Sequence, residues 1–292
     1  MKKLLSITIL FFAAFVAKAQ NSPDVNGDGK VNSADVVSVY NAISNGWTEP
    51  AKDKEFTVNG VTFKMIPVEG GTFTMGATPE QQNPYSDEEP AHQVTLSSYA
   101  IGETEVTQAL WKAVMGNTIE QITKANGWKT YGVGDNYTMY YVSWNDCQQF
   151  ITKLNNLTGR KFRLPTEAEW EFAARGGNKS KGCQYSGSNN ISDVAWYDGN
   201  SSGTTHPVKT KHPNELGIYD MSGNVWEWCQ DWYGSYNSNS QTNPTGPSTG
   251  SFRVFRGGSW GGNAGDCRSS YRSYNTPGFS SNGVGLRLVL VP

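Results

Sequence analysis

Apolar and polar residues alternate with the periods of strands and helices in the part of the chain that follows residue 55. Between residues 56 and 66, two short runs rich in Val, Thr and Phe flank Asn59-Gly60. This dipeptide is typical of the tight turn in a β-hairpin. A further strand is expected at 93–99, where apolar and polar residues alternate again.

Three helices are expected where apolar residues recur at helical spacing behind a residue that can cap a helix. They are 108–115 after Thr107, 144–155 after Ser143 and 167–175 after Thr166. Thr166 and Glu169 have the spacing of a capping box. Beyond residue 177 the pattern indicates turns and short strands, so helices early and irregular strands late predict an α+β domain.

The first residues have the pattern of a cleavable secretory signal peptide, which we place at 1–19. Lys2 and Lys3 precede an apolar run from Leu4 to Val16, and small residues follow at the expected cleavage site. The run is shorter than the roughly 20 residues that span a bilayer. We therefore expect a secreted, periplasmic or cell-surface protein without a transmembrane segment.

Residues 20–46 combine an acidic loop with an apolar helical pattern. Oxygen side chains at loop positions 1, 3, 5 and 12, with Gly at position 6, are what a hard cation requires. The residues expected to bind calcium are Asp24, Asn26, Asp28, Lys30 and Asp35. The segment resembles one half of a dockerin, whose partner is a cohesin, but the second half-repeat is missing. A cohesin-like partner and a simple calcium-stiffened spacer both remain open, and 47–55 is the expected linker.

Composition narrows the classes of function. The 24 Lys and Arg residues nearly balance 26 Asp and Glu residues, which argues against a nucleic-acid partner because such proteins normally carry a basic excess. Apolar residues make up 37% of the chain, but 10 Trp, 14 Tyr and 12 Phe supply large surfaces for a core. The four cysteines, Cys147, Cys183, Cys229 and Cys267, match no metal motif and leave both disulfides and buried thiols open.

Five motifs carry a family resemblance, in the segments Gly70–Gly76, Arg163–Arg175, Gly223–Trp228, Arg256–Trp260 and Gly285–Arg287. Together they resemble the formylglycine-generating enzyme, or sulfatase-modifying factor, family. The similarity covers about residues 60–290, within a single domain that we place at 56–292. It implies a C-type-lectin-like α+β fold with little regular secondary structure.

The resemblance also implies an activity, which the residues put in doubt. Enzymes of the family oxidise a sulfatase Cys to formylglycine with oxygen and copper, which two thiolates five residues apart hold. Here Cys267 matches the second thiolate, and Gly262 stands in place of the first. Soft Cu(I) needs both sulfurs, so the sequence argues against copper. A buried thiol, or a disulfide with Cys229, is the favoured role for Cys267.

A second family site, for calcium, keeps its oxygen ligands in this chain. The matching positions are Asp220, Gly223, Val225 and Glu227, and Glu105 matches a further calcium carboxylate. Two carboxylates around a turn with outward carbonyl groups suit a hard cation. The alternative is that Asp220 and Glu227 are ordinary polar residues of the turn.

The stretch from Trp260 to Gly283 is rich in aromatic and small polar residues, as antibody paratopes are. The resemblance places it at the groove for a substrate peptide, and also at the variable face of receptors with the same fold. The expected ligand-binding residues are Trp260, Arg268, Tyr271, Arg272 and Tyr274. The alternative is that the two arginines pair with core acids and the aromatic side chains are simply packed.

These patterns lead to one preferred function and two alternatives. The preferred function is that of an exported, calcium-binding, non-catalytic protein that binds a protein or glycan through this C-terminal face. The first alternative is a formylglycine-generating oxidase in which Cys267 is the only thiol of the loop. The second is a structural component of a surface assembly, recruited through the dockerin-like helix.

Overall fold

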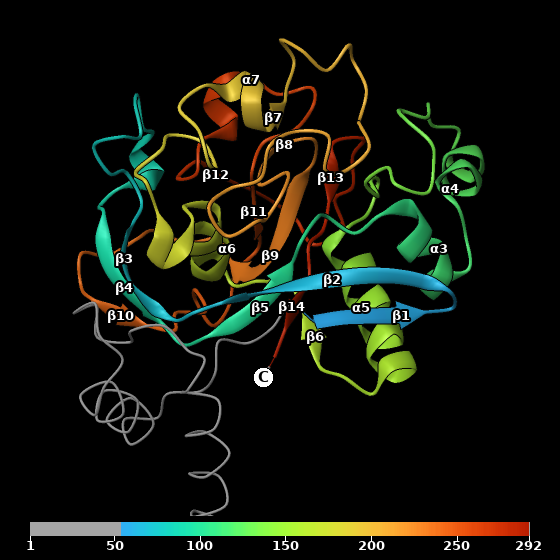
Figure 1. Ribbon diagram of the computed structural model, residues 1–292, viewed down its shortest axis with the longest axis horizontal. Helices are drawn as coiled ribbons and strands as arrows, with labels where there is room; N and C mark the ends of the chain where they lie inside the picture. The colour runs from blue at the N-terminus through green and yellow to red at the C-terminus, as the bar shows by residue number, and fades with distance from the viewer. Residues whose placement is uncertain (1–53, 292) are drawn as a thin grey trace, which may run out of the picture. The chain divides into compact units, whose positions relative to one another are not determined.

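The computed structural model describes residues 54–291, and these residues form a mixture of helices and curled sheets, as the sequence predicts (Figure 1). The expected signal peptide at 1–19 and the calcium loop-helix at 20–46 lie outside the described residues. Strand β1 begins at Lys54, so the last two residues of the expected linker belong to the first strand.

The largest sheet has five strands, all antiparallel to their neighbours. In spatial order they are β1 (Lys54–Val58), β2 (Val61–Val68), β5 (Tyr99–Gly102), β14 (Val289–Leu290) and β6 (Phe162–Arg163). The predicted hairpin is confirmed: β1 pairs with β2, and Asn59 and Gly60 both have positive φ, which the tight turn requires. The sheet therefore joins the first strand of the domain to its last.

Three smaller sheets complete the described part of the chain. A three-stranded sheet has the order β10 (Gln241–Thr242), β4 (His92–Leu96) and β3 (Gly71–Met75). A four-stranded sheet has the order β12 (Arg272–Asn275), β11 (Arg253–Arg256), β9 (Trp226–Trp232) and β13 (Val284–Gly285). Strands β7 (Ala195–Trp196) and β8 (Ser222–Gly223) form a parallel pair. The strand expected at 93–99 is thus divided between β4 and β5.

The helices are short and most begin at a capping side chain. They are α3 (Gln108–Met115), α4 (Ile119–Asn126), α5 (Trp144–Thr158), α6 (Glu167–Ala174), α7 (Ile191–Val194) and the 3-10 turns η1 (Ser86–Glu88), η2 (Gly177–Lys179) and η3 (Ala264–Cys267). The predicted caps of α3, α5 and α6 are confirmed, because Thr107, Ser143 and Thr166 each accept a backbone hydrogen bond from the first turn. Helices α4 and α7 were not expected. None of the helices within 54–291 is long and apolar enough to cross a membrane.

Two large hydrophobic clusters form most of the core, and a small third one surrounds Cys267. One gathers α3 and α5 against the five-stranded sheet, with Trp111 stacked on Phe150 at a centroid distance of 5.2 Å. The other surrounds α6, which Figure 1 shows between β3 and the four-stranded sheet. Every residue of α6 is buried, including three glutamates. Buried charge at this helix requires partners: Glu169 pairs with the nearby Arg163, whereas Glu167 and Glu171 pair with arginines from the C-terminal part of the chain.

Candidate functional site

The loop after β11 contains the two positions at which the resemblance places copper thiolates. Cys267 ends η3, and its side chain is fully buried beside Tyr185. Burial, with the nearby carboxylates of Asp266 and Asp198, raises the pKa of the Cys267 thiol well above its usual value. The side chain is therefore a neutral thiol at pH 7, whereas a metal ligand must be a thiolate.

The other copper position holds no donor. A Cβ added at Gly262 would lie 2.9 Å from Oδ2 of Asp266, so the loop is closed around a residue without a side chain. All four cysteines are free thiols, and Cys147 and Cys229 are buried in clusters other than that of Cys267. The pairing of Cys229 with Cys267, left open by the sequence, is absent. These residues do not fit a two-thiolate copper site.

A set of buried ion pairs, which we name the α6 network, surrounds helix α6 and η1. Its members are Glu88, Glu167, Glu171, Arg256, Arg268 and Arg272, all buried. Arg268 grips Glu88 with two hydrogen bonds of 2.6 and 2.7 Å, and Arg272 grips Glu167 with two of 2.6 and 2.8 Å. Arg256 donates to Glu171 and to Glu167. Each carboxylate therefore has at least one guanidinium partner.

This balance appears in the acidity of the carboxyl groups. Burial alone would raise the pKa of Glu88, but hydrogen bonds from Arg268 and Ser270 bring it below its usual value. The pKa of Glu167 is likewise lowered, because the charges of Arg272 and Arg256 outweigh its burial. Both carboxyl groups are therefore ionised in the folded protein at neutral pH.

The position of the two arginines corrects the sequence expectation. Arg268 and Arg272 were expected among the ligand-binding residues, but their side chains are turned inward and engaged by Glu88 and Glu167. A partner could reach them only by breaking buried ion pairs. The alternative reading, that they pair with core acids, is the one that the structure contains, and we leave both out of the binding surface.

The aromatic residues of the same stretch lie further out. The Tyr274 side chain of β12 is 42% exposed and packs against Tyr233, with ring centroids 3.9 Å apart, and against Phe252, at 5.2 Å. Phe252 is itself 40% exposed. Tyr271 makes an edge contact with the exposed ring of Tyr85 at 5.4 Å. We name Phe252 and Tyr274 the C-terminal aromatic face; Tyr271 and Tyr85 form a separate pair.

Trp260 belongs to another group of rings. It stacks on Tyr131 at a centroid distance of 5.0 Å, and its indole Nε1 donates to the carbonyl of Asn282 at 2.9 Å. Its backbone amide donates to the carbonyl of Asn224. The structure thus divides the expected ligand-binding residues between the interior, the C-terminal aromatic face, the pair of Tyr271 with Tyr85 and the surroundings of Tyr131.

The residues expected to bind calcium lie together but have protein partners. Both carboxylate oxygens of Glu227 accept hydrogen bonds from the buried guanidinium of Arg287, at 2.7 to 3.0 Å. Asp220 accepts from the amide of Lys209 at 2.9 Å. Glu105 accepts from the amide of Val225 at 3.0 Å and from Asn224 Nδ2 at 2.7 Å. Among residues 54–291, no three His, Cys, Asp or Glu side chains are placed to hold one metal ion.

The charges of this group, which we name the Arg287 cluster, are nevertheless unbalanced. Three buried carboxyl groups, of Glu105, Asp220 and Glu227, share the single guanidinium of Arg287. Burial and the nearby charges of Asp220 and Glu227 raise the pKa of Glu105 well above its usual value. Burial, with the charge of Glu227, raises the pKa of Asp220 to about 6. Carboxylate oxygens are donors that calcium prefers, and the cluster has more carboxyl than guanidinium groups, so a bound cation would favour the ionised forms.

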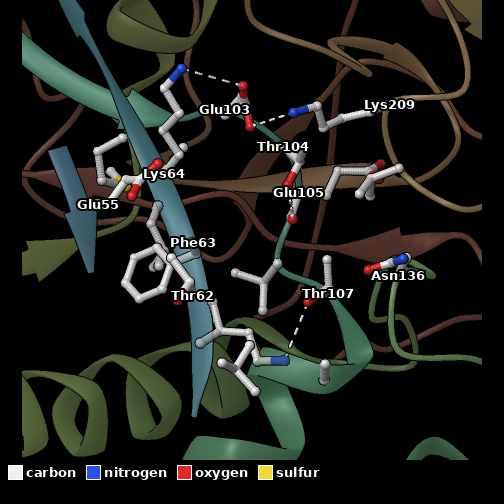
Figure 2. A pocket seen from close by; sticks show the side chains of 18 residues that line it. Glu55, Thr62, Phe63, Lys64, Glu103, Thr104, Glu105, Thr107, Asn136 and Lys209 are labelled. Carbon is white, nitrogen blue, oxygen red and sulfur yellow. Dashed lines mark hydrogen bonds and ion pairs between the residues drawn. The ribbon is translucent and has the colours of Figure 1, made fainter. Parts of the chain in front are cut away.

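A pocket of about 470 Å³ lies beside this cluster, between β2 and the segment 102–110. Figure 2 shows Lys64 and Lys209 reaching Glu103 from opposite sides, with N–O distances of 3.7 and 2.9 Å. Glu105 also lines the pocket. The Glu103 carboxylate is thus held between two ammonium groups.

Sequence reasoning missed several exposed aromatic residues. Tyr85, Trp128 and Phe252 are 56%, 39% and 40% exposed, respectively. The signal for them was local: Tyr85 follows Asn83-Pro84, Trp128 follows Gly127, and Phe252 follows Gly250-Ser251. A large ring beside residues that favour turns is placed on a loop, where it has fewer neighbours to cover it.

Comparisons with known proteins agree with the motifs. A sequence model of the family described as the sulfatase-modifying factor enzyme 1-like domain matches residues 51–291. The chain is 33% identical over 267 residues to a protein named chaperone protein LppX from Paenibacillus barcinonensis, covering 77% of this chain and 87% of the relative. It is 32% identical over 286 residues to a formylglycine-generating enzyme from Streptomyces coelicolor, covering 75% and 86%.

Solved structures show the same similarity. Variable protein 1 of Treponema denticola has a TM-score of 0.73 and 34% identity, over 83% of this chain and all of the other. PvdO of Pseudomonas aeruginosa has a TM-score of 0.67 and 27% identity, over 84% of this chain and all of the other. The names of these relatives include an enzyme, a chaperone and a variable protein, so similarity alone does not decide the activity.

Proposed function

Because this chain belongs to the family of sulfatase-modifying factor enzyme 1-like domains, we propose that it is an exported member that binds a partner instead of oxidising a substrate. The partner, a protein or a glycan, contacts the C-terminal aromatic face. The family motifs support a C-type-lectin-like arrangement beneath this face. In this chain the family fold would therefore serve to bind a partner and not to catalyse oxidation.

The observation that carries the proposal is the exposure of Tyr274 and Phe252 side by side. Large aromatic rings lose little conformational entropy on binding and bury much area, so they often dominate binding energy. Tyr274 is held by its contact with Tyr233 and by the pairing of β12 with β11. A rigid, exposed pair of this kind is suited to contact a partner without prior reorganisation.

The copper position supports the same conclusion. Cys267 is a buried thiol with raised pKa, and Gly262 offers no sulfur. The oxidase alternative would need a single buried thiol to hold Cu(I), which favours two sulfur ligands. Without the pair of copper thiolates, we assign the arginines and glutamates of the α6 network a role in stabilising the fold.

Partner capture tests the binding proposal. The purified protein is exposed to extracellular proteins and to a glycan array, in parallel with a Phe252→Ala/Tyr274→Ala variant. Leu157→Ala is the matched control, because Leu157 is 52% exposed on α5 and lies outside the face. We expect a ligand that the double variant loses and the control retains. Equal capture by all three proteins would refute the face as the binding surface.

An oxidation assay tests the enzymatic alternative. A peptide containing Cys-x-Pro-x-Arg is incubated with the protein, Cu(I), a reductant and oxygen, and conversion of its thiol to an aldehyde is followed by mass spectrometry. We expect no conversion by the natural chain. The Gly262→Cys variant supplies the missing sulfur, and its Cu(I) affinity is compared by competition with a chelator. Turnover by the natural chain would replace our proposal by the oxidase.

Calcium binding is the second part of the proposal. The Arg287 cluster is supported as a site by its oxygen donors and its excess of carboxyl over guanidinium groups, and the loop at 20–46 by its ligand spacing. Export is supported by the signal-peptide pattern at 1–19. Recruitment into a surface assembly through the dockerin-like helix stays a prediction on residues outside those described.

A further inference from the structure

A row of aromatic residues runs along the segment 128–141 and ends at Trp260. Trp128 stacks on Tyr141 with ring centroids 4.5 Å apart, and Tyr141 contacts Tyr140 at 5.3 Å. Tyr140 accepts a hydrogen bond of 2.6 Å from the amide of Tyr131, which stacks on Trp260. We name these five residues the aromatic ladder. It includes none of the residues of the C-terminal aromatic face.

The rings of the ladder are fixed by hydrogen bonds to the backbone. Tyr141 Oη donates to the carbonyl of Lys129 at 3.3 Å, and Tyr140 Oη donates to the carbonyl of Gly132 at 3.1 Å. The indole of Trp260 donates to the carbonyl of Asn282. These three polar ring edges are therefore satisfied within the protein. Tyr140 is fully buried and supports the row from inside, whereas Trp128 is exposed and Tyr131, Tyr141 and Trp260 are partly exposed.

The backbone at Tyr141, whose ring belongs to the ladder, has a strained conformation. Its φ is 59°, in the left-handed region that costs a residue with a side chain about 1–2 kcal/mol. The Tyr141 amide donates to the carbonyl of Ser281 at 3.0 Å, which ties the ladder to the loop 276–283. Strain retained at an aromatic surface residue is often associated with a functional site.

The outer end of the ladder is open. Trp128 is 39% exposed, although one of its faces rests on Tyr141. Two charges of opposite sign lie near the ladder: the Lys129 ammonium is 4.8 Å from the centre of the Tyr131 ring, and the charge of Glu120 acts on Tyr140. A strongly charged ligand is therefore not what these rings select.

We propose that the aromatic ladder binds an oligosaccharide, with Trp128 as its principal contact. A sugar ring presents a face of weakly positive C–H bonds, which complements the negative face of an aromatic ring. Its hydroxyl groups lie at the rim, and Ser281 and Asn282, two half-buried polar residues, belong to the adjoining loop. Fixed, uncharged rings beside such polar residues suit a carbohydrate.

The inference rests on the proposed role in binding but assigns a different surface and a ligand class. Binding of the full chain to cellohexaose, chitohexaose, xylohexaose and mannohexaose is measured by isothermal titration calorimetry. We expect at least one of the four to bind, and Trp128→Ala to weaken it about tenfold or more, which corresponds to about 1.4 kcal/mol. Trp128→Phe keeps a ring and should retain part of the affinity.

Tyr274→Ala is the matched control, because Tyr274 is similarly exposed but lies on the other surface. Circular dichroism and thermal unfolding establish that each variant is folded. If none of the four sugars binds at millimolar concentration, or if Trp128→Ala binds as well as the natural chain, the ladder is not a carbohydrate site. Loss of sugar binding in Tyr274→Ala alone would overturn the ladder and support the C-terminal aromatic face.

Discussion

The α6 network and the Arg287 cluster are both buried and both built from glutamate and arginine, yet their charges are balanced differently. In the α6 network each of three carboxylates meets a guanidinium, and the pKa values of Glu88 and Glu167 are lowered. In the Arg287 cluster three carboxyl groups share one guanidinium, and the pKa values of Glu105 and Asp220 are raised. The difference separates a region that supports the fold from one that can respond to protons or cations.

The largest effect is expected from breaking the balance of the α6 network. Arg268→Met leaves the Glu88 carboxylate buried without its guanidinium, and loss of one partner of a buried pair costs about 3–5 kcal/mol in the free energy of unfolding. Urea denaturation measures this change. Arg268→Met/Glu88→Leu removes both charges and should recover much of the loss, whereas Lys209→Met, at a half-exposed pair, should cost less than about 1 kcal/mol. Equal losses for the single and double variants would contradict the assigned balance.

The next effect concerns the pH dependence of stability. It has opposite signs for Asp220 of the Arg287 cluster and for Glu88 of the α6 network. The folded pKa of Asp220 is above its unfolded value, so the folded state binds the extra proton and its stability falls as pH rises from about 4 through 6. The rise from 3.8 to about 6 corresponds to a loss of about 3 kcal/mol. Asp231, which accepts a hydrogen bond from the amide of Glu167 in the α6 network, has its pKa raised to about 8 by burial and by the charge of Glu167, so it adds a fall in stability from about pH 4 to about pH 8.

Denaturation curves between pH 4 and pH 8 check this prediction. Asp220→Asn should flatten the decline between about pH 4 and pH 6, and Asp231→Asn the decline across the whole range from about pH 4 to pH 8. Glu88→Gln should act on the acid side instead, because a lowered pKa gives stability that is lost as pH falls below about 4.5. A natural chain whose stability does not change across pH 4 to 8 would show that the carboxyl groups of the Arg287 cluster are not protonated.

Calcium should stabilise the Arg287 cluster and leave the α6 network unaffected. A ligand that binds only the folded state at one hundred times its Kd adds about 2.7 kcal/mol. We expect calcium to raise the unfolding temperature of the natural chain and to raise it less in Asp220→Asn. Asp28→Ala removes a ligand of the expected N-terminal loop and should keep the part of the shift that arises in the cluster. An identical shift in Asp220→Asn would assign the calcium effect to another site.

The smallest effect on stability is expected at the exposed rings. Tyr274→Ala removes a side chain that is 42% exposed, so the free energy of unfolding should change by no more than about 1 kcal/mol. Partner binding should nevertheless be lost. Thermal unfolding and the capture assay, measured on the same preparation, separate the two outcomes. A large loss of stability would mean that Tyr274 supports β12 and is not primarily a contact residue.

The parts of the fold that the sequence predicts are the ones that depend on neighbouring residues. The turn at Asn59-Gly60 and the caps Thr107, Ser143 and Thr166 require particular side chains at particular positions, and all are present in the structure. Helix α4 had the same kind of signal, a capping box from Thr118 to Gln121, and was missed for want of a clear apolar stripe. Turn and capping residues therefore predict the local structure correctly at these positions.

The site could be predicted less well because its partners are far apart in sequence. Arg268 meets Glu88 across 180 residues, and Arg272 meets Glu167 across 105. In the sequence of the C-terminal stretch, an arginine that pairs with a buried acid cannot be distinguished from an arginine that is free to bind a ligand. The motifs located the copper position, since Gly262 and Cys267 lie on one loop, but the burial of Cys267 depends on Tyr185 from another segment.

The place of β14 in the largest sheet has a consequence for how the protein forms. β14 lies between β5 and β6. These two strands are synthesised earlier, and they can be joined in one sheet only after Val289 and Leu290 have been synthesised. A growing chain can form the β1–β2 hairpin, but a ribosome must release nearly the whole domain before β6 gains its neighbour. Folding should accordingly be a late event, coupled to the completion of translation rather than following its progress.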